Sequence, residues 1–338
     1  KESCVGVYKM LENSNPDWVI ETKNLSKMYG PHLALDGLNL QIPRGAIGVL
    51  GPNGAGKSTL FKCILGLIQI TSGSGQVLGF DIQKEGEKIR SKIGYMPEYD
   101  ALDPGLSAID QVRYAGEILG MNTDVATQRA HEVLEYVGLK DQRYRKIDTF
   151  STGMKQATKL ACALIHDPEI LICDEPTNGL DKRARKFMLD TLRRTAEEGE
   201  RTVLLSSHVM DDVQEVCSSI LMIYKGKVVL QKKIEELVNQ VEKEIEITIW
   251  GGASIMETQL IDDGYKVRRL GRILRVTLMD NNTISGILKI AAECKVQVRQ
   301  LKEYQPDLED IFLLIMDKLG EEIKGTSDLM IPKHIGGD

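Results

Sequence analysis

Nine consecutive residues after position 50 have the composition of a loop that binds the phosphates of a nucleotide. They fit the pattern G-x-x-x-x-G-K-[ST] at every position. The glycines let successive backbone N–H groups point at phosphate oxygens, and a helix predicted from Lys57 adds partial positive charge at its N-terminus. We expect Lys57 to reach the β- and γ-phosphates and the Ser58 hydroxyl to bind Mg²⁺. The sequence therefore predicts a nucleoside triphosphate site whose contacts include Asn53, Gly54, Ala55, Gly56, Lys57, Ser58 and Thr59.

Two carboxylates end an apolar run further along the chain. Asp174 and Glu175 follow directly after residues 170–173, which are all apolar. An acid at the end of a neighbouring parallel strand can face the metal beside a phosphate loop, so we expect Asp174 to hold Mg²⁺. Glu175 then points at the water that attacks the γ-phosphate. A solvated turn with two acids is the alternative, and the phosphate loop makes it the less favoured one.

The elements that must position these residues indicate an α/β domain. Short apolar runs alternate with helical patterns from Trp18 to about Val229, which favours a mostly parallel sheet. A mainly helical block from about 100 to 165 interrupts the strands. The clearest apolar runs are 47–50, 170–173 and 202–205. Helices are expected at 57–68, 106–120, 123–137 and 182–198, the last with Asp181 as its N-cap and Gly199 as its stop.

After Gln231 the pattern changes to alternating apolar and polar residues. Strands are expected at 244–250, 265–269, 273–279 and 296–303, with helices at 253–262 and 283–293. The order β-α-β-β-α-β is typical of a ferredoxin-like fold, and an amphipathic segment, 308–319, follows it. We divide the chain into a lead-in (1–17), an α/β domain (18–235), a smaller α+β domain (236–318) and a flexible tail (319–338).

The composition excludes several classes of protein. The 338 residues are 42% hydrophobic and 27% charged, with a formal net charge of −6. Those totals argue against disorder, and the missing basic excess argues against a nucleic-acid partner. No apolar run reaches the length of a membrane-spanning helix, so we expect none. The six cysteines are scattered without a CxxC pair, which predicts reduced, buried thiols.

Further motifs resemble those of the ATP-binding cassette (ABC) ATPase subunits, in the same order along the chain. The resemblance covers about residues 18–230. Its parts are Lys27-Met28-Tyr29-Gly30 as the adenine-stacking loop, Ile93-Gly94-Tyr95-Met96-Pro97-Glu98 as the Q-loop, Phe150-Ser151-Thr152-Gly153-Met154-Lys155-Gln156 as the family signature, Asp174-Glu175-Pro176-Thr177-Asn178-Gly179-Leu180-Asp181 as the acidic strand end with its D-loop, and Ser206-Ser207-His208 as the switch histidine.

The resemblance implies a P-loop NTPase cassette with an inserted helical subdomain that hydrolyses ATP with Mg²⁺. It implies catalysis by Lys57, Glu175 and His208, and stacking of Tyr29 on adenine. Ser58, Glu98 and Asp174 are the implied metal ligands. In the family, the signature faces the γ-phosphate bound by another subunit, so two copies, or one copy and a related cassette, close around two ATP molecules. That assigns Ser151, Gly153, Met154 and Asp181 to the partner's nucleotide.

Three positions depart from the common family pattern. Glu98 stands where many members have Gln, Thr152 where Gly is common, and Ala157 where many have Arg. These variants, with Met154-Lys155-Gln156 and the segment 306–312, resemble the ABC-2-type exporter branch. That branch implies a separate permease, docked by the helical block, with this chain on the cytoplasmic face of the cell membrane. The alternatives are an importer ATPase with a regulatory C-terminal domain and a non-transport ABC ATPase.

Overall fold

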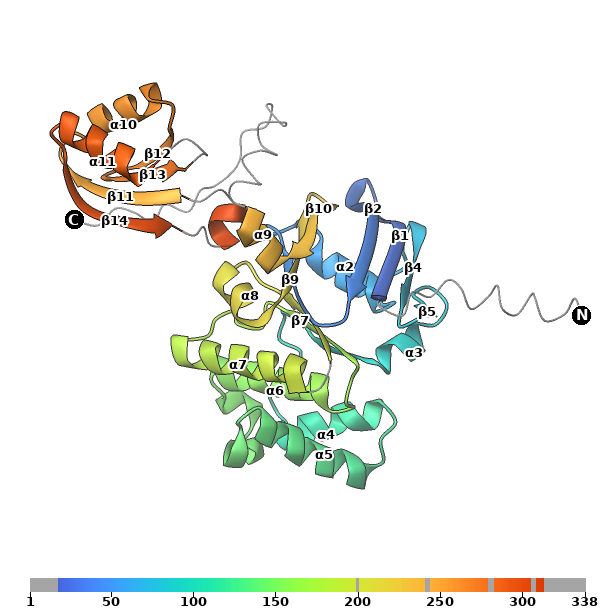
Figure 1. Ribbon diagram of the computed structural model, residues 1–338. Coiled ribbons are helices and arrows are strands. Elements are labelled where there is room, and N and C mark those ends of the chain that lie inside the picture. Colours follow the sequence, from blue (N-terminus) through green and yellow to red (C-terminus); the bar gives the residue numbers. More distant parts are fainter. Residues whose placement is uncertain (1–17, 199–200, 241–243, 279–282, 305–307, 313–338) are drawn as a thin grey trace, which may run out of the picture. The chain divides into compact units, whose positions relative to one another are not determined.

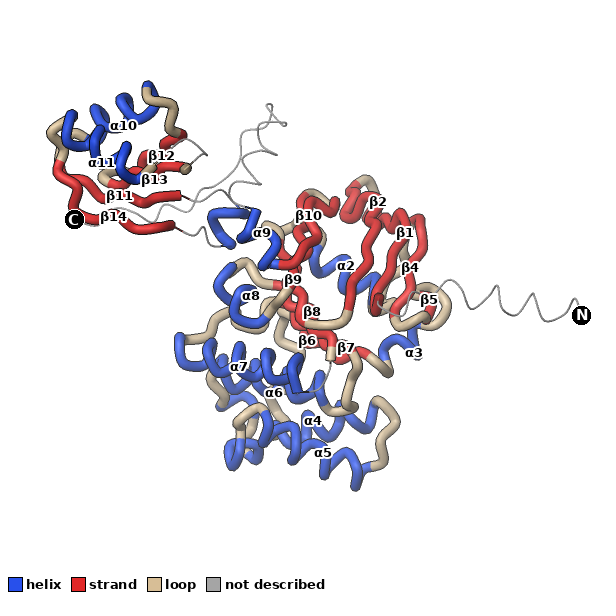
Figure 2. Tube along the Cα trace, viewed as in Figure 1, coloured by secondary structure: helices blue, strands red, loops and turns tan. Residues whose placement is uncertain are grey.

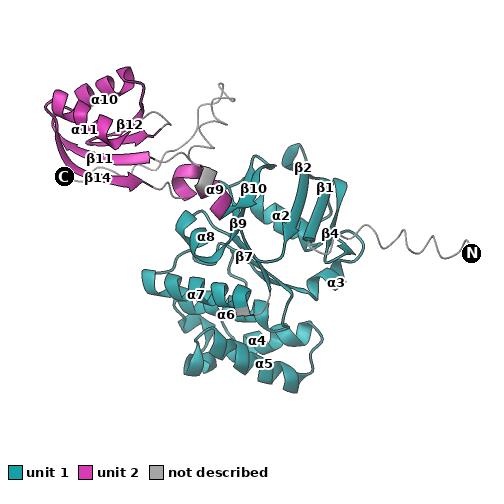
Figure 3. Cartoon of the chain, in the orientation of Figure 1, with its two compact units in different colours: residues 1–234 teal, residues 235–338 magenta. Residues whose placement is uncertain are grey.

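The computed structural model describes residues 18–198, 201–240, 244–278, 283–304 and 308–312 (Figure 1). The predicted lead-in, the flexible tail, the helix stop at Gly199 and most of the predicted amphipathic segment lie outside these residues. The chain divides into two compact units, residues 1–234 and 235–338 (Figure 3). None of the described helices combines the length and apolar character needed to cross a membrane.

The first unit is built on a six-stranded sheet that is mostly parallel, as the sequence predicts. Every residue of its strands β3, β7 and β8 is buried, which explains why their sequences are mostly apolar. The strand order is β10-β9-β3-β8-β7-β6, and only the edge strand β10 runs antiparallel to its neighbour. The strands are β3 (Ala46–Leu50), β6 (Ile93–Met96), β7 (Ile170–Asp174), β8 (Thr202–Ser206), β9 (Ser219–Tyr224) and β10 (Lys227–Lys233).

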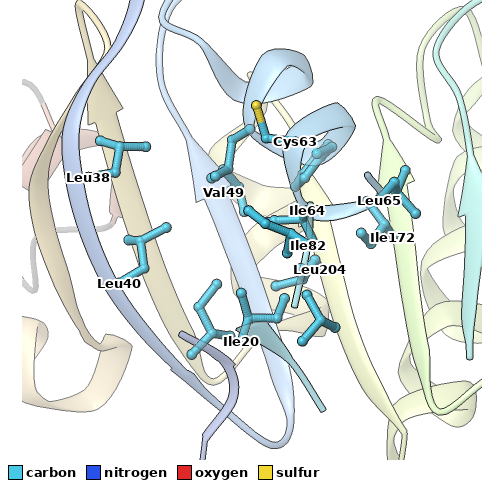
Figure 4. Packing of buried hydrophobic residues seen from close by; sticks show 14 of the residues in the cluster. Ile20, Leu38, Leu40, Val49, Cys63, Ile64, Leu65, Ile82, Ile172 and Leu204 are labelled. Carbon is cyan, nitrogen blue, oxygen red and sulfur yellow. The ribbon is translucent and has the colours of Figure 1, made fainter. Parts of the chain in front are cut away.

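A second, antiparallel sheet in this unit was not expected. Its order is β2-β1-β4-β5, with β1 (Trp18–Tyr29), β2 (His32–Pro43), β4 (Ser72–Val77) and β5 (Phe80–Asp81). The pairing of β1 with β2 shifts register several times, which breaks the period of two that marks a strand. Helix α2 (Lys57–Ile64) packs with both sheets in one core. Figure 4 shows Leu38 and Leu40 from β2, Val49 from β3 and Ile64 from α2 gathered there.

Helix α2 ends earlier than its predicted boundary at residue 68. Gly66 has a left-handed backbone with φ of 62°, and its N–H donates to the Cys63 carbonyl. The N–H of Leu67 donates to the Lys62 carbonyl at 2.9 Å. This is the hydrogen-bond pattern of a glycine-terminated helix. The apolar residues after Gly66 prolong the helical pattern in the sequence without prolonging the helix.

The helical block follows β6. Figure 2 shows α4 and α5 at the end of this unit away from β1, β2 and β4. Side chains cap the helices that begin after Ser107, Asn122 and Ser151. The block comprises α4 (Ala108–Ile118), α5 (Thr123–Tyr136), the short 3₁₀ helices η1 (Lys140–Tyr144) and η2 (Ile147–Thr149), and α6 (Thr152–Leu164); the unit also contains α3 (Gly86–Arg90), α7 (Lys182–Glu198) and α8 (Met210–Val216).

The second unit has the predicted ferredoxin-like order. Its sheet, β12-β13-β11-β14, is antiparallel throughout. One face of the sheet packs on two helices through a core that includes Ile247, Met256 and Ile287. After α9 (Ile234–Gln240), the elements are β11 (Glu244–Trp250), α10 (Ala253–Asp262), β12 (Lys266–Leu270), β13 (Ile273–Thr277), α11 (Ile284–Glu293) and β14 (Gln297–Tyr304).

The described cysteines are free thiols, as predicted, but Cys162 and Cys294 are only partly buried. The free thiols are Cys63, Cys162, Cys173, Cys217 and Cys294, and Cys4 lies outside the described residues. Burial raises the pKa of Cys63 to about 11, although the charge of Lys27 opposes this shift. Burial likewise raises the pKa values of Cys162, Cys173 and Cys217, so these three thiols and Cys63 stay uncharged.

Gly94 allows α6 to pack directly on β6. A Cβ atom at this position would lie 2.1 Å from the carbonyl oxygen of Ala163. We predict that Gly94→Ala lowers the free energy of unfolding by roughly 1–3 kcal/mol, because the helix backbone must shift. Urea unfolding measures the change. Gly105→Ala is the control, since its Cβ would meet only Asp103 Oδ1, at 3.3 Å. Equal stabilities of the two variants would contradict this packing role.

Candidate active site

The phosphate loop joins β3 to α2. The ammonium group of Lys57 is buried and donates to the carbonyl oxygen of Gly51 at 2.7 Å. Gly56 has φ of 110°, and a Cβ there would lie 2.8 Å from the Ala34 carbonyl oxygen, so only glycine fits. No side chain caps α2 at Gly56, which leaves N–H groups of its first turn available to an anion.

A cavity of about 350 Å³ opens over this loop, and we call it the nucleotide cavity. It brings together most of the residues that the sequence predicts for the site. It also includes His32 and Ala34, which sequence reasoning missed. His32 pairs with Tyr29 across the β1–β2 turn. Its position three residues after the predicted aromatic residue is the sequence feature that could have placed it in the site. The lining residues are Tyr29, His32, Ala34, Asn53, Gly54, Ala55, Gly56, Lys57, Ser58, Thr59, Glu98, Asp174 and Glu175.

Tyr29 provides an exposed aromatic ring at this cavity. The residue is 44% exposed. The Lys27 ammonium lies 4.9 Å from the ring centroid and donates to the Gln69 carbonyl at 2.8 Å. A cation over the ring stabilises its position.

Asp174 and Glu175 share a hydrogen-bonding partner, Ser206. The Ser206 hydroxyl donates to Asp174 Oδ1 at 2.6 Å and accepts from the Glu175 N–H at 3.0 Å. Asp174 and Ser206 are register partners on the neighbouring strands β7 and β8, and both are buried. Ser206 therefore orients the acidic pair. Sequence reasoning included it in the motif that ends at His208 but gave it no role.

Glu175 also contacts the predicted switch histidine. His208 Nδ1 lies 2.8 Å from Glu175 Oε2. When Nδ1 donates to this carboxylate, Nε2 is left for another group. Glu175 is buried and has a left-handed backbone with φ of 51°, a conformation that concentrates at functional sites. His208 is absent from the lining of the nucleotide cavity and joins the site through Glu175.

Asp212 on α8 supports the segment that follows Glu175. It is fully buried and accepts from the Thr177 hydroxyl at 2.6 Å and from Arg185 Nε at 2.6 Å. These bonds hold the D-loop segment to α7 and α8. Sequence reasoning missed Asp212, because two adjacent acids early in a short helix look like a solvated face.

Besides His208, four of the predicted site residues lie outside the nucleotide cavity. Ser151, Gly153, Met154 and Asp181 line a separate hollow of about 740 Å³, which we call the signature hollow. Ser151 caps α6 by accepting from the Met154 N–H at 3.3 Å. Asp181 accepts from the Ala184 N–H at 2.8 Å, which confirms it as the N-cap of α7. A single chain therefore does not bring these four residues to its own phosphate loop.

The departure at Thr152 is accommodated beside the D-loop. A Cβ atom on Gly179 would lie 3.3 Å from Thr152 Cγ2, so the threonine methyl group lies over this glycine. Gly179 has φ of 73°, which an L side chain rarely adopts. Glycine at 179 leaves room for the extra side chain at 152.

The donor atoms of the cavity suit Mg²⁺. Ser58, Glu98 and Asp174 line it together and offer only oxygen ligands. Magnesium ions in phosphate-binding sites use one or two carboxylates with phosphate oxygens and water, so a dedicated protein cage is not required. Consistent with this, the described residues contain no group of three or more His, Cys, Asp or Glu side chains arranged to hold a metal ion.

We predict that Ser206→Ala lowers the free energy of unfolding by roughly 1–3 kcal/mol, because the buried Asp174 carboxylate and the Glu175 N–H each lose a partner. The substitution also releases the acidic pair, so turnover should fall with little change in nucleotide affinity. Urea unfolding and steady-state assays measure both. Ser91→Ala, at an exposed hydroxyl that donates to the Lys88 carbonyl, is the control. A Ser206→Ala variant as stable and active as the wild type would remove the positioning role.

A strand, phosphate loop and helix, with acids at the end of a parallel strand of the same sheet, define a P-loop nucleoside triphosphatase. The acidic strand β7 is not the immediate neighbour that the sequence predicts, because β8 lies between β3 and β7. The family model for the ABC transporter matches residues 35–178. The linearmycin resistance ATP-binding protein LnrL of Bacillus subtilis (strain 168) is 34% identical, over 87% of this chain and 97% of LnrL. The chain therefore belongs to the ABC transporter family of ATP-binding proteins, and it is an ATPase.

Two further comparisons agree. The daunorubicin/doxorubicin resistance ATP-binding protein DrrA of Streptomyces peucetius is 35% identical, over 67% of this chain and 68% of DrrA. Among solved structures, the dimeric post-hydrolysis state of the ATP-binding cassette MJ0796 bound to ADP and Pi superimposes with a TM-score of 0.59. It is 26% identical and covers 63% of this chain and 98% of that chain.

Proposed function

We propose that this chain is the ATP-hydrolysing subunit of an ABC-2-type exporter and that it drives a separate permease as an ATP-dependent dimer. The observation that carries this proposal is the division of the site. The phosphate-binding and acidic residues share one cavity, whereas the signature residues line another hollow. The names of LnrL and DrrA, which are resistance proteins, support export over import.

The nucleotide cavity binds ATP through two sets of its lining residues. Tyr29 stacks on the adenine ring, and residues 53–59 hold the phosphates through backbone N–H groups and the Lys57 ammonium. Lys57 already donates to a carbonyl of the loop, so its charge is held in place before the nucleotide arrives. Ser58, Glu98 and Asp174 hold Mg²⁺, which supplies charge neutralisation when bound.

Glu175 performs the acid–base step. Its buried carboxylate orients the attacking water and accepts a proton from it. His208 holds the carboxyl group in place, and Ser206 holds the backbone N–H of Glu175. The role proposed for His208 Nε2 is a hydrogen bond to the γ-phosphate and to the water. Catalysis by these residues depends mainly on positioning and on offsetting charge.

The signature residues complete the site of the partner subunit. Ser151 and the N–H groups at the start of α6 bind the γ-phosphate held by the other chain, together with Gly153, Met154 and Asp181. The two chains close when both nucleotides are present, and hydrolysis removes the bridge between them. The partner is a second copy or a related cassette.

The permease places this dimer on the cytoplasmic face of the cell membrane. The helical block with α4 and α5 docks it, and the second unit strengthens the dimer. The proposal is tested by expressing the tagged chain with the membrane protein encoded by a neighbouring reading frame. We expect the two to purify together in detergent and ATP turnover to fall when the permease carries a disrupted docking loop. Purification with ribosomes or DNA instead would contradict the proposal.

A further inference from the structure

The loop that carries Glu98, residues 97–100, is held by a lysine from α6. Lys159 Nζ donates to the carbonyl oxygens of Pro97 at 2.7 Å, of Glu98 at 3.1 Å and of Tyr99 at 3.2 Å. The lysine is only 6% exposed, and burial lowers the pKa of its ammonium group. We call this contact the Lys159 clamp.

The clamp uses the whole ammonium group. A lysine has three N–H donors and no acceptor, so three carbonyls satisfy it completely. Among the described residues no carboxylate forms an ion pair with Lys159, and its charge is therefore directed at the backbone of the loop. An apolar residue at this position would leave the buried Pro97 carbonyl without a donor, which is costly. Arginine would not replace it, because its planar guanidinium cannot converge on three carbonyls in this way.

The same helix carries the signature. Ser151 caps the start of α6, and Lys155, one turn later, pairs with Asp100 at 3.5 Å. Lys159 follows on the same face, because residues four apart in a helix are neighbours. At 1.5 Å per residue, the start of the helix lies about 12 Å from the clamp. One rigid element thus begins at the signature hollow and holds the loop that lines the nucleotide cavity.

We propose that Lys159 is a positioning residue that fixes the Glu98 loop to α6, so that the Glu98 carboxylate and the signature of one chain move as one body. In the proposed dimer, Glu98 binds the Mg²⁺ of its own chain's nucleotide, whereas Ser151 binds the γ-phosphate of the partner's nucleotide. The Lys159 clamp therefore links the two ATP sites through a single helix. This inference rests on the proposed roles of Glu98 and Ser151.

The clamp is tested by hydrogen exchange on the full chain without nucleotide. Lys159→Met keeps the side-chain length and removes all three donors. We expect the amides at the end of β6, residues 95–96, to exchange about 10-fold faster or more, since Pro97 directly after this strand loses its bond to α6. Lys92→Met is the control, because Lys92 forms an exposed ion pair with Glu169 at 2.8 Å near the other end of β6. Unchanged exchange in Lys159→Met would overturn the inference; Lys159→Gln gives the same readout if the Met variant does not fold.

The effect on Glu98 is tested by titrating Mg²⁺ in four chains: wild type, Lys159→Met, Glu98→Gln and the double variant. Each single substitution should raise the Mg²⁺ concentration for half-maximal turnover by about 10-fold. The double variant should need the same Mg²⁺ concentration as the more affected single variant, because both substitutions act through the Glu98 carboxylate. If the two increases in the Mg²⁺ requirement multiply in the double variant, the positioning role of Lys159 is overturned. A wild-type Mg²⁺ requirement in Glu98→Gln, with faster exchange in Lys159→Met, would instead refute the metal role of Glu98 and leave the clamp supported.

Discussion

Replacing Glu175 with Gln is expected to slow ATP turnover by about 10²–10⁴-fold while ATP still binds. The two side chains have nearly the same size, so the buried position and the hydrogen bond from the backbone N–H of residue 175 to the Ser206 hydroxyl remain. The amide cannot accept a proton from the attacking water. Steady-state phosphate release and binding of a fluorescent ATP analogue measure the two effects separately.

The same variant should accumulate as a dimer. The γ-phosphate that bridges the chains persists when hydrolysis is blocked, so ATP should shift the Glu175→Gln chain to twice its mass on a sizing column. Glu169→Gln is the matched control, because Glu169 precedes β7 and its side chain is 43% exposed. Wild-type turnover in Glu175→Gln would remove this residue from its proposed role.

Replacing Ser151 with Asp is expected to reduce turnover by about 10–1,000-fold without weakening ATP binding to the monomer. Aspartate is as good an N-cap as serine, so α6 keeps the bond that Ser151 now accepts from the Met154 N–H. The new charge would stand against the partner's γ-phosphate, and two like charges about 4 Å apart cost about 1–4 kcal/mol between the limits of water and a protein surface. Turnover and monomer affinity are measured as for Glu175.

Ser151→Asn separates charge from shape, since Asn has the size of Asp and caps equally well. It should lose much less activity than Ser151→Asp. A large loss of ATP affinity in the monomeric Asp variant would show that Ser151 serves the nucleotide of its own chain. Equal losses for Asn and Asp would show that the partner's phosphate charge is not involved.

The parts of the site that could be predicted are those with a local pattern. The phosphate loop follows the buried strand β3, and Asp174 and Glu175 stand at and just after the end of the buried strand β7. Both strands are mostly apolar, so short segments of sequence indicate the chemistry and the place in the fold together. The ferredoxin-like order of the second unit was predicted for the same reason, because its strands alternate regularly between apolar and polar residues.

The supporting residues could not be predicted, because their partners are distant in the sequence. Lys159 holds a loop some sixty residues earlier, and Asp212 binds Thr177 and Arg185 from another helix and loop. A single polar residue in a helix has no pattern that distinguishes such a role from a solvated face. The fold shows the same limit in β4, where Ser-Gly-Ser-Gly-Gln-Val forms a strand through pairing with β1 rather than through its own propensity.

We propose that each chain carries half of a catalytic centre, because the signature hollow and the nucleotide cavity are separate in one chain. Specific ATP turnover measured across serial dilutions of the isolated chain tests this most directly. We expect the rate per chain to rise with protein concentration and to level off once dimers predominate. The same rate per chain at every dilution, with the protein monomeric by light scattering, would contradict the account.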